Sequence, residues 1–265
     1  MDERKKTTVA YEIIANKFAP KRSDKTSDMY TNSHSICFGK CNCDCIFCDF
    51  KKRPCSAYQV YSLESFSKII DELLLKGKNF KFTGGEPTLN LELEKHLEIV
   101  KSKGGYIYLD SNGSNPKYLE RLIKKDLINV LGISLKGITI EEATQVSQVK
   151  KSELIWENVW KTLDISSKYS DNIRTIVTLV FIIENRENRL ATFAKLLEKY
   201  PNVYMKVNNL QRDDHPEHLN IHSINPDSLY KEIESFVKEN PIWENRVIYV
   251  PSSDGVSNYN SIMFF

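Results

Sequence analysis

The sequence predicts an α/β fold, a partial barrel of six β-α units followed by a short α+β extension. Short β-branched segments alternate with amphipathic helical segments, and glycine or asparagine residues separate them. The chain has 265 residues, of which 41% are hydrophobic, enough for one large core. Strands that alternate with helices form a parallel sheet through right-handed crossovers.

Three regions are expected along the chain. Residues 1–28 form a charged, loose N-terminal segment, and residues 29–210 form the partial barrel. Residues 211–265 form an extension that adds a helix after Pro226 and a strand at 247–250. We expect this extension to cover the substrate side of the barrel.

The first two units are marked by helical periodicity and glycine stops. From Ser62, apolar residues recur at i, i+3, i+4, i+7 and i+8, and Gly77 ends the pattern. The next helix stops at Gly104. The elements expected here are a strand at 30–38, the helix from 62, a strand at 80–83 and a helix near 89–103.

The four later units repeat this alternation. Asn115 is a natural N-cap, with Pro116 at the first helical position. The fifth strand is strongly β-branched. The elements expected are a strand at 106–110, a helix from 116, a strand at 130–135, a helix through roughly 153–167, a strand at 174–183, a helix near 189–199 and a strand at 203–207.

The charge and hydropathy of the chain exclude several partners. Lys and Arg number 37 against 35 Asp and Glu, which gives a net charge of +2, and the basic residues are scattered, so we expect no nucleic acid. No apolar run is long enough to span a bilayer, and the first residues lack a secretion signal. We therefore expect a cytoplasmic protein with no membrane partner.

The cysteines are confined to one segment. All six lie between Cys37 and Cys55, so they cannot form a disulfide framework spread over the fold. In a reducing compartment, clustered thiols indicate a metal or iron-sulfur site. The absence of later cysteines argues against auxiliary clusters.

One trio of cysteines has the spacing C-x3-C-x2-C, namely Cys41, Cys45 and Cys48. Three thiolates on a compact loop suit three irons of a cubane and leave the fourth iron open, whereas closed zinc sites take four protein ligands. A zinc knuckle that uses four of the six cysteines is the alternative. In the first assignment the spare cysteines are Cys37, Cys43 and Cys55.

A second motif, Gly84-Gly85-Glu86-Pro87, lies between a predicted strand and a predicted helix. Glycines there let the backbone come close to a ligand, and a carboxylate can face a cation. A turn of this kind alone would be a weak signal, but it follows the cysteine loop by one β-α unit.

The two motifs in this order resemble the radical S-adenosylmethionine (SAM) superfamily, which also has an aromatic residue before the last cysteine, here Phe47. The resemblance implies a 4Fe-4S cluster on Cys41, Cys45 and Cys48, with SAM on the open iron and its ammonium group at residues 84–86. It also implies reductive cleavage of SAM to a 5′-deoxyadenosyl radical, which abstracts hydrogen from a substrate. The fold implied is a partial (β/α)6 barrel.

Over residues 30–210 the chain looks like the activating enzymes of glycyl radical proteins, notably those of anaerobic ribonucleotide reductase and pyruvate formate-lyase. This likeness implies that Lys136 meets the SAM carboxylate, that Arg174 stands near the same group, and that Asp110 and Asn112 line the ribose side.

Ser134 departs from the pattern of those activators. It lies in the cofactor-binding segment. At this position the activators carry an aspartate, which completes a monovalent cation site together with an earlier aspartate, here Asp110. A serine offers one weak ligand and no charge, so the likeness does not extend to that cation site.

Three functions are compatible with the sequence. In the first, the enzyme abstracts hydrogen from a glycine of a partner protein. In the second, it modifies a small molecule or short peptide. Either requires a low-potential electron donor of the flavodoxin or ferredoxin type. In the third, the chain is a non-catalytic zinc-binding protein.

Overall fold

One mixed sheet organises the chain in the computed structural model, which describes residues 9–18, 33–48, 50, 59–149, 151–182, 188–210, 221–251 and 263–264. Its strand order is β10-β9-β8-β7-β6-β5-β4-β2-β1-β3. The strands are β1 (Val9–Phe18), β2 (Ser33–Phe38), β3 (Gln59–Tyr61), β4 (Asn79–Gly84), β5 (Tyr106–Ser111), β6 (Val130–Leu135), β7 (Arg174–Phe181), β8 (Val203–Asn209), β9 (Val247–Val250) and β10 (Met263–Phe264).

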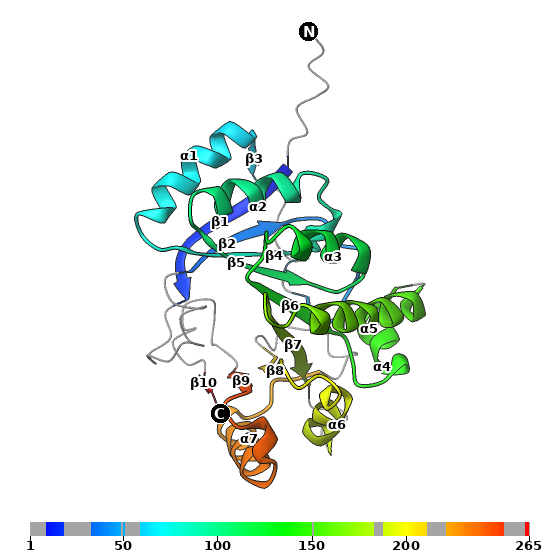
Figure 1. Cartoon of the computed structure of the whole chain (residues 1–265). Helices are drawn as coiled ribbons and strands as arrows, with labels where there is room; N and C mark the ends of the chain where they lie inside the picture. The colour runs from blue at the N-terminus through cyan, green and yellow to red at the C-terminus, as the bar shows by residue number, and fades with distance from the viewer. Residues whose placement is uncertain are drawn as a thin grey trace.

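Helices connect most of the successive strands (Figure 1). They are α1 (Leu63–Leu74), α2 (Leu93–Ser102), α3 (Pro116–Lys124), α4 (Ile140–Ser147), α5 (Ser152–Lys168), α6 (Arg189–Leu197) and α7 (Pro226–Glu239). Seven neighbouring strands, β2 and β4 to β9, run parallel. The predicted α/β partial barrel is therefore confirmed.

Helices α1 and α7 begin at residues whose side chains cap the first turn. The Ser62 side chain accepts a hydrogen bond from the Ser65 N–H at the start of α1, and the Asn225 side chain accepts one from the Ser228 N–H at the start of α7. Helix α3 starts with Pro116, whose missing N–H would have no helical partner at that position.

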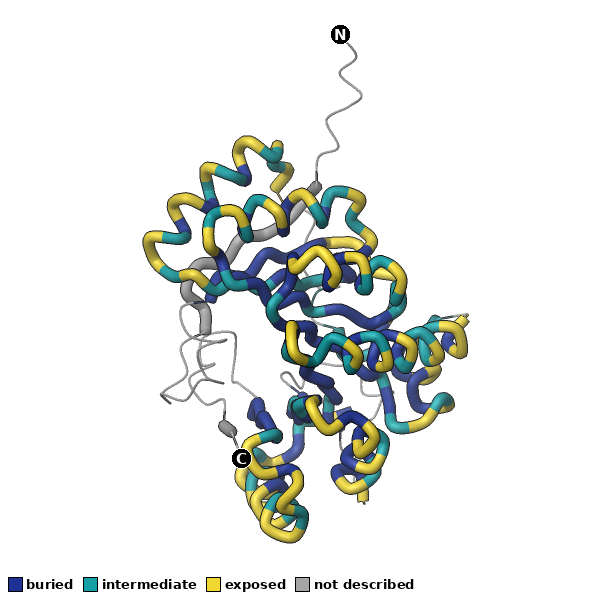
Figure 2. The backbone as a smooth tube through the Cα atoms, viewed as in Figure 1, coloured by how far each residue is buried: buried dark blue, intermediate teal, exposed yellow. Residues whose placement is uncertain are grey.

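The two faces of the sheet differ in composition. The face against the helices carries the main apolar core, with alternate residues such as Phe82, Leu109 and Val207 fully buried (Figure 2). The residues between them point to the other side, which we call the inner face. It carries an apolar cluster that includes Tyr108, Val130, Ile176, Ile248 and Val250, and polar side chains that include Lys81 and Asp110.

Several elements differ from the sequence prediction in presence or in place. Strand β1 lies in the segment expected to be loose, and it pairs antiparallel with β2. Helix α4 was not predicted. Strand β9 continues the parallel sheet beside β8, so this part of the extension belongs to the barrel. The prediction that the extension covers the substrate concerns residues that lie partly outside the described ones.

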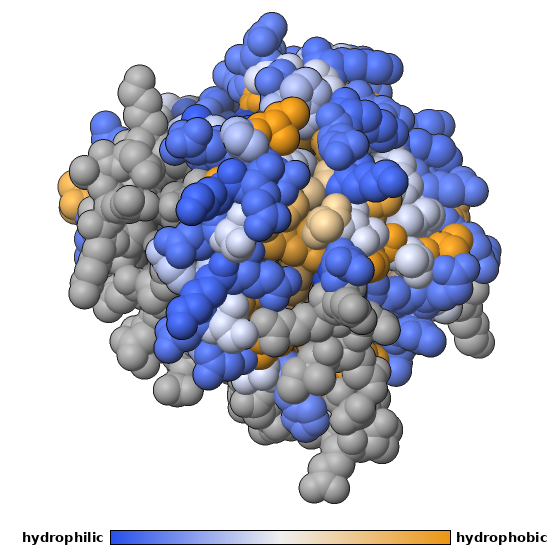
Figure 3. All heavy atoms as spheres, turned by 90° about the horizontal axis from the view of Figure 1, so that it is seen from below, coloured by the Kyte–Doolittle hydropathy of each residue, from blue (hydrophilic) through white to orange (hydrophobic). Residues whose placement is uncertain are grey.

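The described surface is largely hydrophilic. Figure 3 shows one face on which hydrophobic side chains gather in groups between hydrophilic ones. Large apolar side chains that are exposed, such as Leu75, Leu91 and Ile242, belong to separate elements. Within the described ranges, no helix is both long and apolar enough to cross a membrane.

Candidate functional site

The cysteine loop begins where β2 ends and is fixed by backbone hydrogen bonds on two sides. On one side, the Gly85 and Glu86 N–H groups donate to the carbonyl oxygens of Phe38 (2.6 Å) and Lys40 (2.7 Å). This joins the two sequence motifs at the carboxyl ends of β2 and β4, the edge where parallel sheets carry ligands.

On the other side the loop is attached to the end of α4. The Asp44 N–H donates to the Ser147 carbonyl (2.8 Å), and the Ile46 N–H donates to the Val146 carbonyl (3.0 Å). These carbonyls belong to the last turn of a helix and have no helical partner of their own. The loop therefore caps α4, and α4 orders the loop.

Gly84 and Gly85 are required because the backbone of the turn passes very close to the backbone of Phe38 and Lys40. A side chain on Gly85 would place its Cβ 2.1 Å from the Lys40 oxygen, and one on Gly84 would lie 2.5 Å from the backbone of Phe38. Gly84 also has φ of +104°, which disfavours other residues. The glycines allow the turn to contact the cysteine loop directly.

The thiols of the loop interact with one another. Cys45 is buried, Cys43 and Cys48 are half-buried, and Cys41 is exposed. Hydrogen bonds from the Cys43 thiol and N–H lower the pKa of the Cys41 thiol to about 7, and the same thiol–thiol contact raises the pKa of Cys43. Cys41 is thus the thiol of this pair that more readily becomes a thiolate, the form that binds metal.

Lys136 faces these thiols from the end of β6. Burial lowers the pKa of its ammonium group, but attraction to Cys45, Cys43 and Cys41 outweighs that effect and raises it overall. Its Nζ lies 2.7 Å from the Ser134 Oγ. The structure therefore brings together Lys136, Ser134 and the cysteine loop.

Glu86 is almost fully buried, with 1% of its surface exposed. Its carboxylate accepts hydrogen bonds from the Thr88 hydroxyl (2.6 Å) and N–H (3.1 Å), the Ser111 hydroxyl (2.8 Å) and the Asn112 N–H (2.6 Å). Burial raises the pKa of Glu86, while these four donors favour its ionised form. Its carboxylate connects the glycine turn to the end of β5.

Asn112 carries this connection on to the cysteine loop. Its Nδ2 donates to the Asn42 Oδ1 (2.7 Å) and lies 3.4 Å from the Cys43 Sγ. The Asn42 side chain in turn donates to the Ser114 hydroxyl (3.0 Å). Asn112 thus lies beside the cysteine loop.

Asp110 lies deeper on the inner face. Its Oδ2 is 3.1 Å from the Lys81 Nζ and accepts a hydrogen bond from the Thr83 hydroxyl (3.2 Å). Burial raises the pKa of the Asp110 carboxyl. The positive charges of Lys81 and Lys206 lower it by more than burial raises it, so the net shift is downward. Lys81 was not selected from the sequence, although a lysine between Phe80 and Phe82 in a strand could have indicated a polar inner face.

Phe47 packs against an apolar cluster at the carboxyl ends of β7 and β8. The buried members of this cluster are Ile182, Leu210 and Ile221. Phe47 belongs to the cysteine loop, so this packing holds the loop against the carboxyl end of the barrel, where the cofactor is expected.

Arg174 does not join the other predicted residues. It is the first residue of β7 and pairs with Val130 at the amino end of β6, whereas Ser134 pairs with Thr178. Four residues of strand separate these levels, which is about 13 Å. Its guanidinium lies 5.2 Å from the centre of the Tyr204 ring. The expectation that Arg174 stands near the SAM carboxylate is therefore wrong.

Arg174 lines a hollow at the amino-terminal edge of the sheet, opposite the edge that carries the cysteine loop. It has a volume of about 540 Å³ and is lined mainly by loop residues that precede the strands, including Asn129, Asp171, Asn202 and Arg246. Parallel sheets rarely carry their chemistry at that edge.

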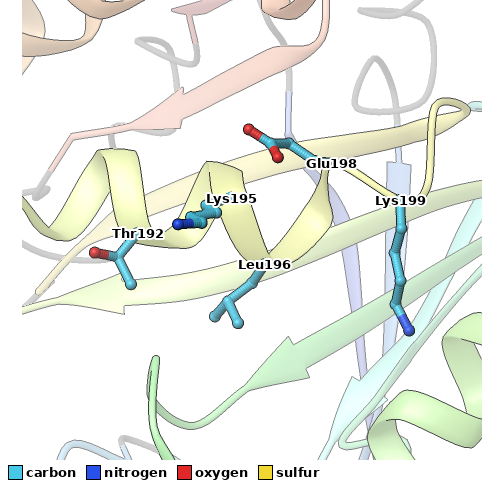
Figure 4. A pocket seen from close by; sticks show the side chains of 5 residues that line it. All are labelled: Thr192, Lys195, Leu196, Glu198 and Lys199. Atoms are coloured by element: carbon cyan, nitrogen blue, oxygen red, sulfur yellow. The ribbon is translucent and has the colours of Figure 1, made fainter.

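A second depression runs along α6. Its lining is Thr192, Lys195, Leu196, Glu198 and Lys199. Figure 4 shows that these side chains point in different directions from α6 and from the residues that follow it. They do not converge on a ligand.

The carboxyl-end site fits the predicted cluster in its donor chemistry. Three thiols at the required spacing lie on one loop, and an ammonium group faces that loop. Within the described ranges no three Cys, His, Asp or Glu side chains surround a common point, so the ligand assignment rests on donor type and spacing.

Curated relatives match parts of the chain. A candidate glycyl-radical enzyme activating enzyme of Methanocaldococcus jannaschii is 32% identical over 37% of this chain, and the 7-carboxy-7-deazaguanine synthase of Haemophilus influenzae is 38% identical over 29% of it. The matched segments span about a third of the length of these relatives, 36% and 34%. The 7-carboxy-7-deazaguanine synthase of M. jannaschii is 25% identical over 77% of this chain and 84% of its own length.

Solved structures share the fold. TYW1 with a lysine-pyruvate adduct has a TM-score of 0.57 at 19% identity, covering 87% of this chain and 86% of that one. A radical SAM methyltransferase from Sphaerobacter thermophilus has a TM-score of 0.59 at 15% identity, covering 88% and 71% of the two chains.

The sequence profile of the radical SAM superfamily matches residues 35–196, which is more than half of the chain. This range contains the cysteine loop, the glycine turn and the strand ends that lie beside them. The chain therefore belongs to the radical SAM superfamily, whose enzymes use a 4Fe-4S cluster and SAM.

Proposed function

We propose that this enzyme cleaves SAM reductively and uses the resulting radical to abstract hydrogen from a substrate, with Cys41, Cys45 and Cys48 holding the cluster. The observation that carries the proposal is the pair of backbone hydrogen bonds that join the cysteine loop to the Gly85-Glu86 turn. They hold the segment that leads into the cysteine loop against the backbone of the glycine turn, which supports a common site for the two motifs. When bound and reduced, the cluster supplies the electron that breaks the C5′–S bond of SAM.

The surrounding residues have distinct roles in this proposal. Residues 84–86 hold the SAM ammonium group with their backbone, because the Glu86 carboxylate is already surrounded by internal donors. Lys136, whose ammonium group faces the thiols of the loop, attracts the SAM carboxylate. Asn112 contacts the ribose side, and Phe47 shields the cluster from water.

For the substrate, the glycine of a glycyl radical protein is the first candidate. The likeness to the activating enzymes over residues 30–210 and the relative from M. jannaschii support it. A small molecule is the second candidate, supported by the longer match to a 7-carboxy-7-deazaguanine synthase. The electron donor in either case is a flavodoxin- or ferredoxin-type protein.

Anaerobic reconstitution with iron and sulfide, followed by dithionite and SAM, tests the chemistry. We expect a coloured protein that forms 5′-deoxyadenosine, detected by mass spectrometry. A colourless protein that contains zinc and yields no 5′-deoxyadenosine would contradict the proposal. Adding a glycyl radical protein from a neighbouring gene distinguishes the substrates, since glycyl radical formation is visible by electron paramagnetic resonance.

A monovalent cation is expected to be unnecessary for this activity. The Lys81 ammonium lies 3.1 Å from Asp110 and supplies the positive charge, while Ser134 offers no second carboxylate. Replacing Na⁺ and K⁺ by tetramethylammonium should therefore leave the rate of 5′-deoxyadenosine formation unchanged within twofold. A loss of tenfold or more that K⁺ restores would show that a cation binds here despite Lys81.

A further inference from the structure

A buried ion pair joins α4 to α6, and the proposed chemistry assigns it no role. It is formed by Glu142, in the first turn of α4, and Arg189, the first residue of α6. The Arg189 Nη2 donates a hydrogen bond to the Glu142 Oε1. Only 8% of the surface of Glu142 and 1% of that of Arg189 are exposed. Because two charges lose their hydration here, the pair is better explained by the geometry that it fixes than by a gain in stability.

Glu142 also attaches α4 to the chain that leaves β6. Its Oε2 accepts a hydrogen bond from the Ile138 N–H (2.8 Å), and the Thr139 hydroxyl accepts one from the Glu142 N–H (3.2 Å). These contacts form a variant of the capping box. Gly137 makes the approach possible, because a Cβ there would lie 2.8 Å from the Glu142 Cβ. One carboxylate oxygen therefore contacts the end of β6, and the other contacts Arg189.

Arg189 depends on Glu142 for its position. The carbon of its guanidinium lies 5.5 Å from the centre of the Phe181 ring, at the end of β7. Its Nε and Nη1 are buried and have no hydrogen-bond partner in the part of the chain that the structure describes. Loss of the Glu142 charge would therefore leave this buried guanidinium without its described acceptor.

The anchor of the cysteine loop lies one helical turn further along α4. Val146 follows Glu142 by four residues, and both are buried, so they lie on one buried face of the helix. The Val146 and Ser147 carbonyls accept the hydrogen bonds from the Ile46 and Asp44 N–H groups. A helix of eight residues has little stability of its own and keeps its place through tertiary contacts. The ion pair in the first turn of α4 therefore helps to determine where these carbonyls lie.

The cysteine loop has a second support at the end of β7. Ile46 and Phe47 pack against the cluster that contains Ile182, and Ile182 directly follows Phe181. The loop is thus held by α4 on one side and by the end of β7 on the other. Because the ion pair joins these two supports, it fixes their separation.

We propose that Glu142 and Arg189 are positioning residues for the iron-sulfur cluster. Their ion pair fixes α4 relative to the end of β7, and α4 in turn holds the cysteine loop in the arrangement that binds iron. Both side chains act through the backbone of α4 and are not ligands of the cluster. The inference rests on the proposed function, because it concerns the loop that holds the cluster there.

Hydrogen exchange of the apoprotein, followed for each amide by nuclear magnetic resonance, tests this link without the cluster. Glu142→Gln keeps an acceptor for the Ile138 N–H but removes the charge that holds Arg189. We expect the Asp44 and Ile46 amides to exchange at least about tenfold faster than in the wild type, because α4 then opens locally. Arg189→Met should have the same effect, and Arg189→Lys, which keeps the charge, should have a smaller one.

Two further variants separate this positioning role from a general loss of stability. Ile70→Ala removes a buried side chain from α1, which packs against α2 and β3. It should speed the exchange of the β5 amides and leave that of the two loop amides nearly unchanged. The double variant Glu142→Gln/Arg189→Met has neither buried charge, so it should unfold at a higher temperature than either single variant. Its loop amides should still exchange fast, because the link between α4 and β7 is absent.

Reconstitution with iron and sulfide connects this result to the cluster. Glu142→Gln should hold less than about half of the iron of the wild type, because its cysteine loop is less well ordered. Ile70→Ala, in which α4 keeps its ion pair, should hold nearly all of it.

Three results would overturn the proposal. They are loop amides that are unprotected in the wild type, loop amides that exchange at the wild-type rate in the double variant, and an equal acceleration of loop and β5 amides in Glu142→Gln. If one of these occurs while the wild type binds iron and forms 5′-deoxyadenosine, only the positioning role is wrong. If the wild type forms neither cluster nor 5′-deoxyadenosine, the proposed function fails regardless of the exchange rates.

Discussion

Alanine at Cys41, Cys45 or Cys48 is expected to remove the iron-sulfur cluster and reduce 5′-deoxyadenosine formation to background. In the proposed site each thiolate holds one iron of the cubane, and the short loop offers no replacement at the same spacing. Iron and sulfide analysis after reconstitution, together with the visible absorbance, measures the cluster directly.

Cys43→Ala is the matched control for these variants. Cys43 is on the same loop, and its thiol donates to Cys41, so its loss changes the loop chemistry without removing a proposed ligand. We expect nearly full iron content. Loss of the cluster in Cys43→Ala with retention in Cys45→Ala would show that the ligand spacing has been assigned incorrectly.

Glu86→Ala is expected to destabilise the fold by about 3 kcal/mol or more, because it leaves buried donors of Thr88, Ser111 and Asn112 without an acceptor. For a chain of this size that lowers Tm by roughly 6–12 °C. Thermal unfolding of the apoprotein measures the effect. SAM affinity should fall as well, since the glycine turn loses its connection to β5.

Two further variants make the Glu86 result specific. Glu86→Gln keeps one acceptor oxygen for Thr88 and Ser111 but turns an amide toward the Asn112 N–H, so we expect an intermediate loss. Glu64→Ala, which breaks an exposed pair with Lys68, should leave the Tm of the apoprotein nearly unchanged, because water screens this pair. An equal effect of Glu64→Ala and Glu86→Ala would contradict the role of the buried carboxylate.

The parts of the site that were predictable from the sequence are local. The cysteine spacing and the glycine turn each lie on a few consecutive residues, and the cysteine loop and the turn do lie side by side. The strands and most helices were predictable for the same reason, since their periodicity is local. Strand β1 was missed because the charged residues around it outweighed the apolar alternation from Val9 to Ile13.

The remaining features depend on strand register or on distant contacts. Arg174 was placed by its likeness to a motif, but a strand that starts at this residue carries it to the wrong edge. Lys81 and Lys206 meet only because β4 and β8 curve toward the same interior. Helix α4 has eight residues, and its contact with the cysteine loop is not encoded in either segment alone.

The attachment of the cysteine loop to α4 has a consequence for the biosynthesis of the protein. The loop leaves the ribosome early, but the carbonyls of Val146 and Ser147 that fix Asp44 and Ile46 are made only after β6 is complete. Chains fold from the N-terminus as they are synthesised. During that interval the nascent chain carries its thiols without their second anchor, so the cysteine loop reaches its final arrangement only after α4 has been made.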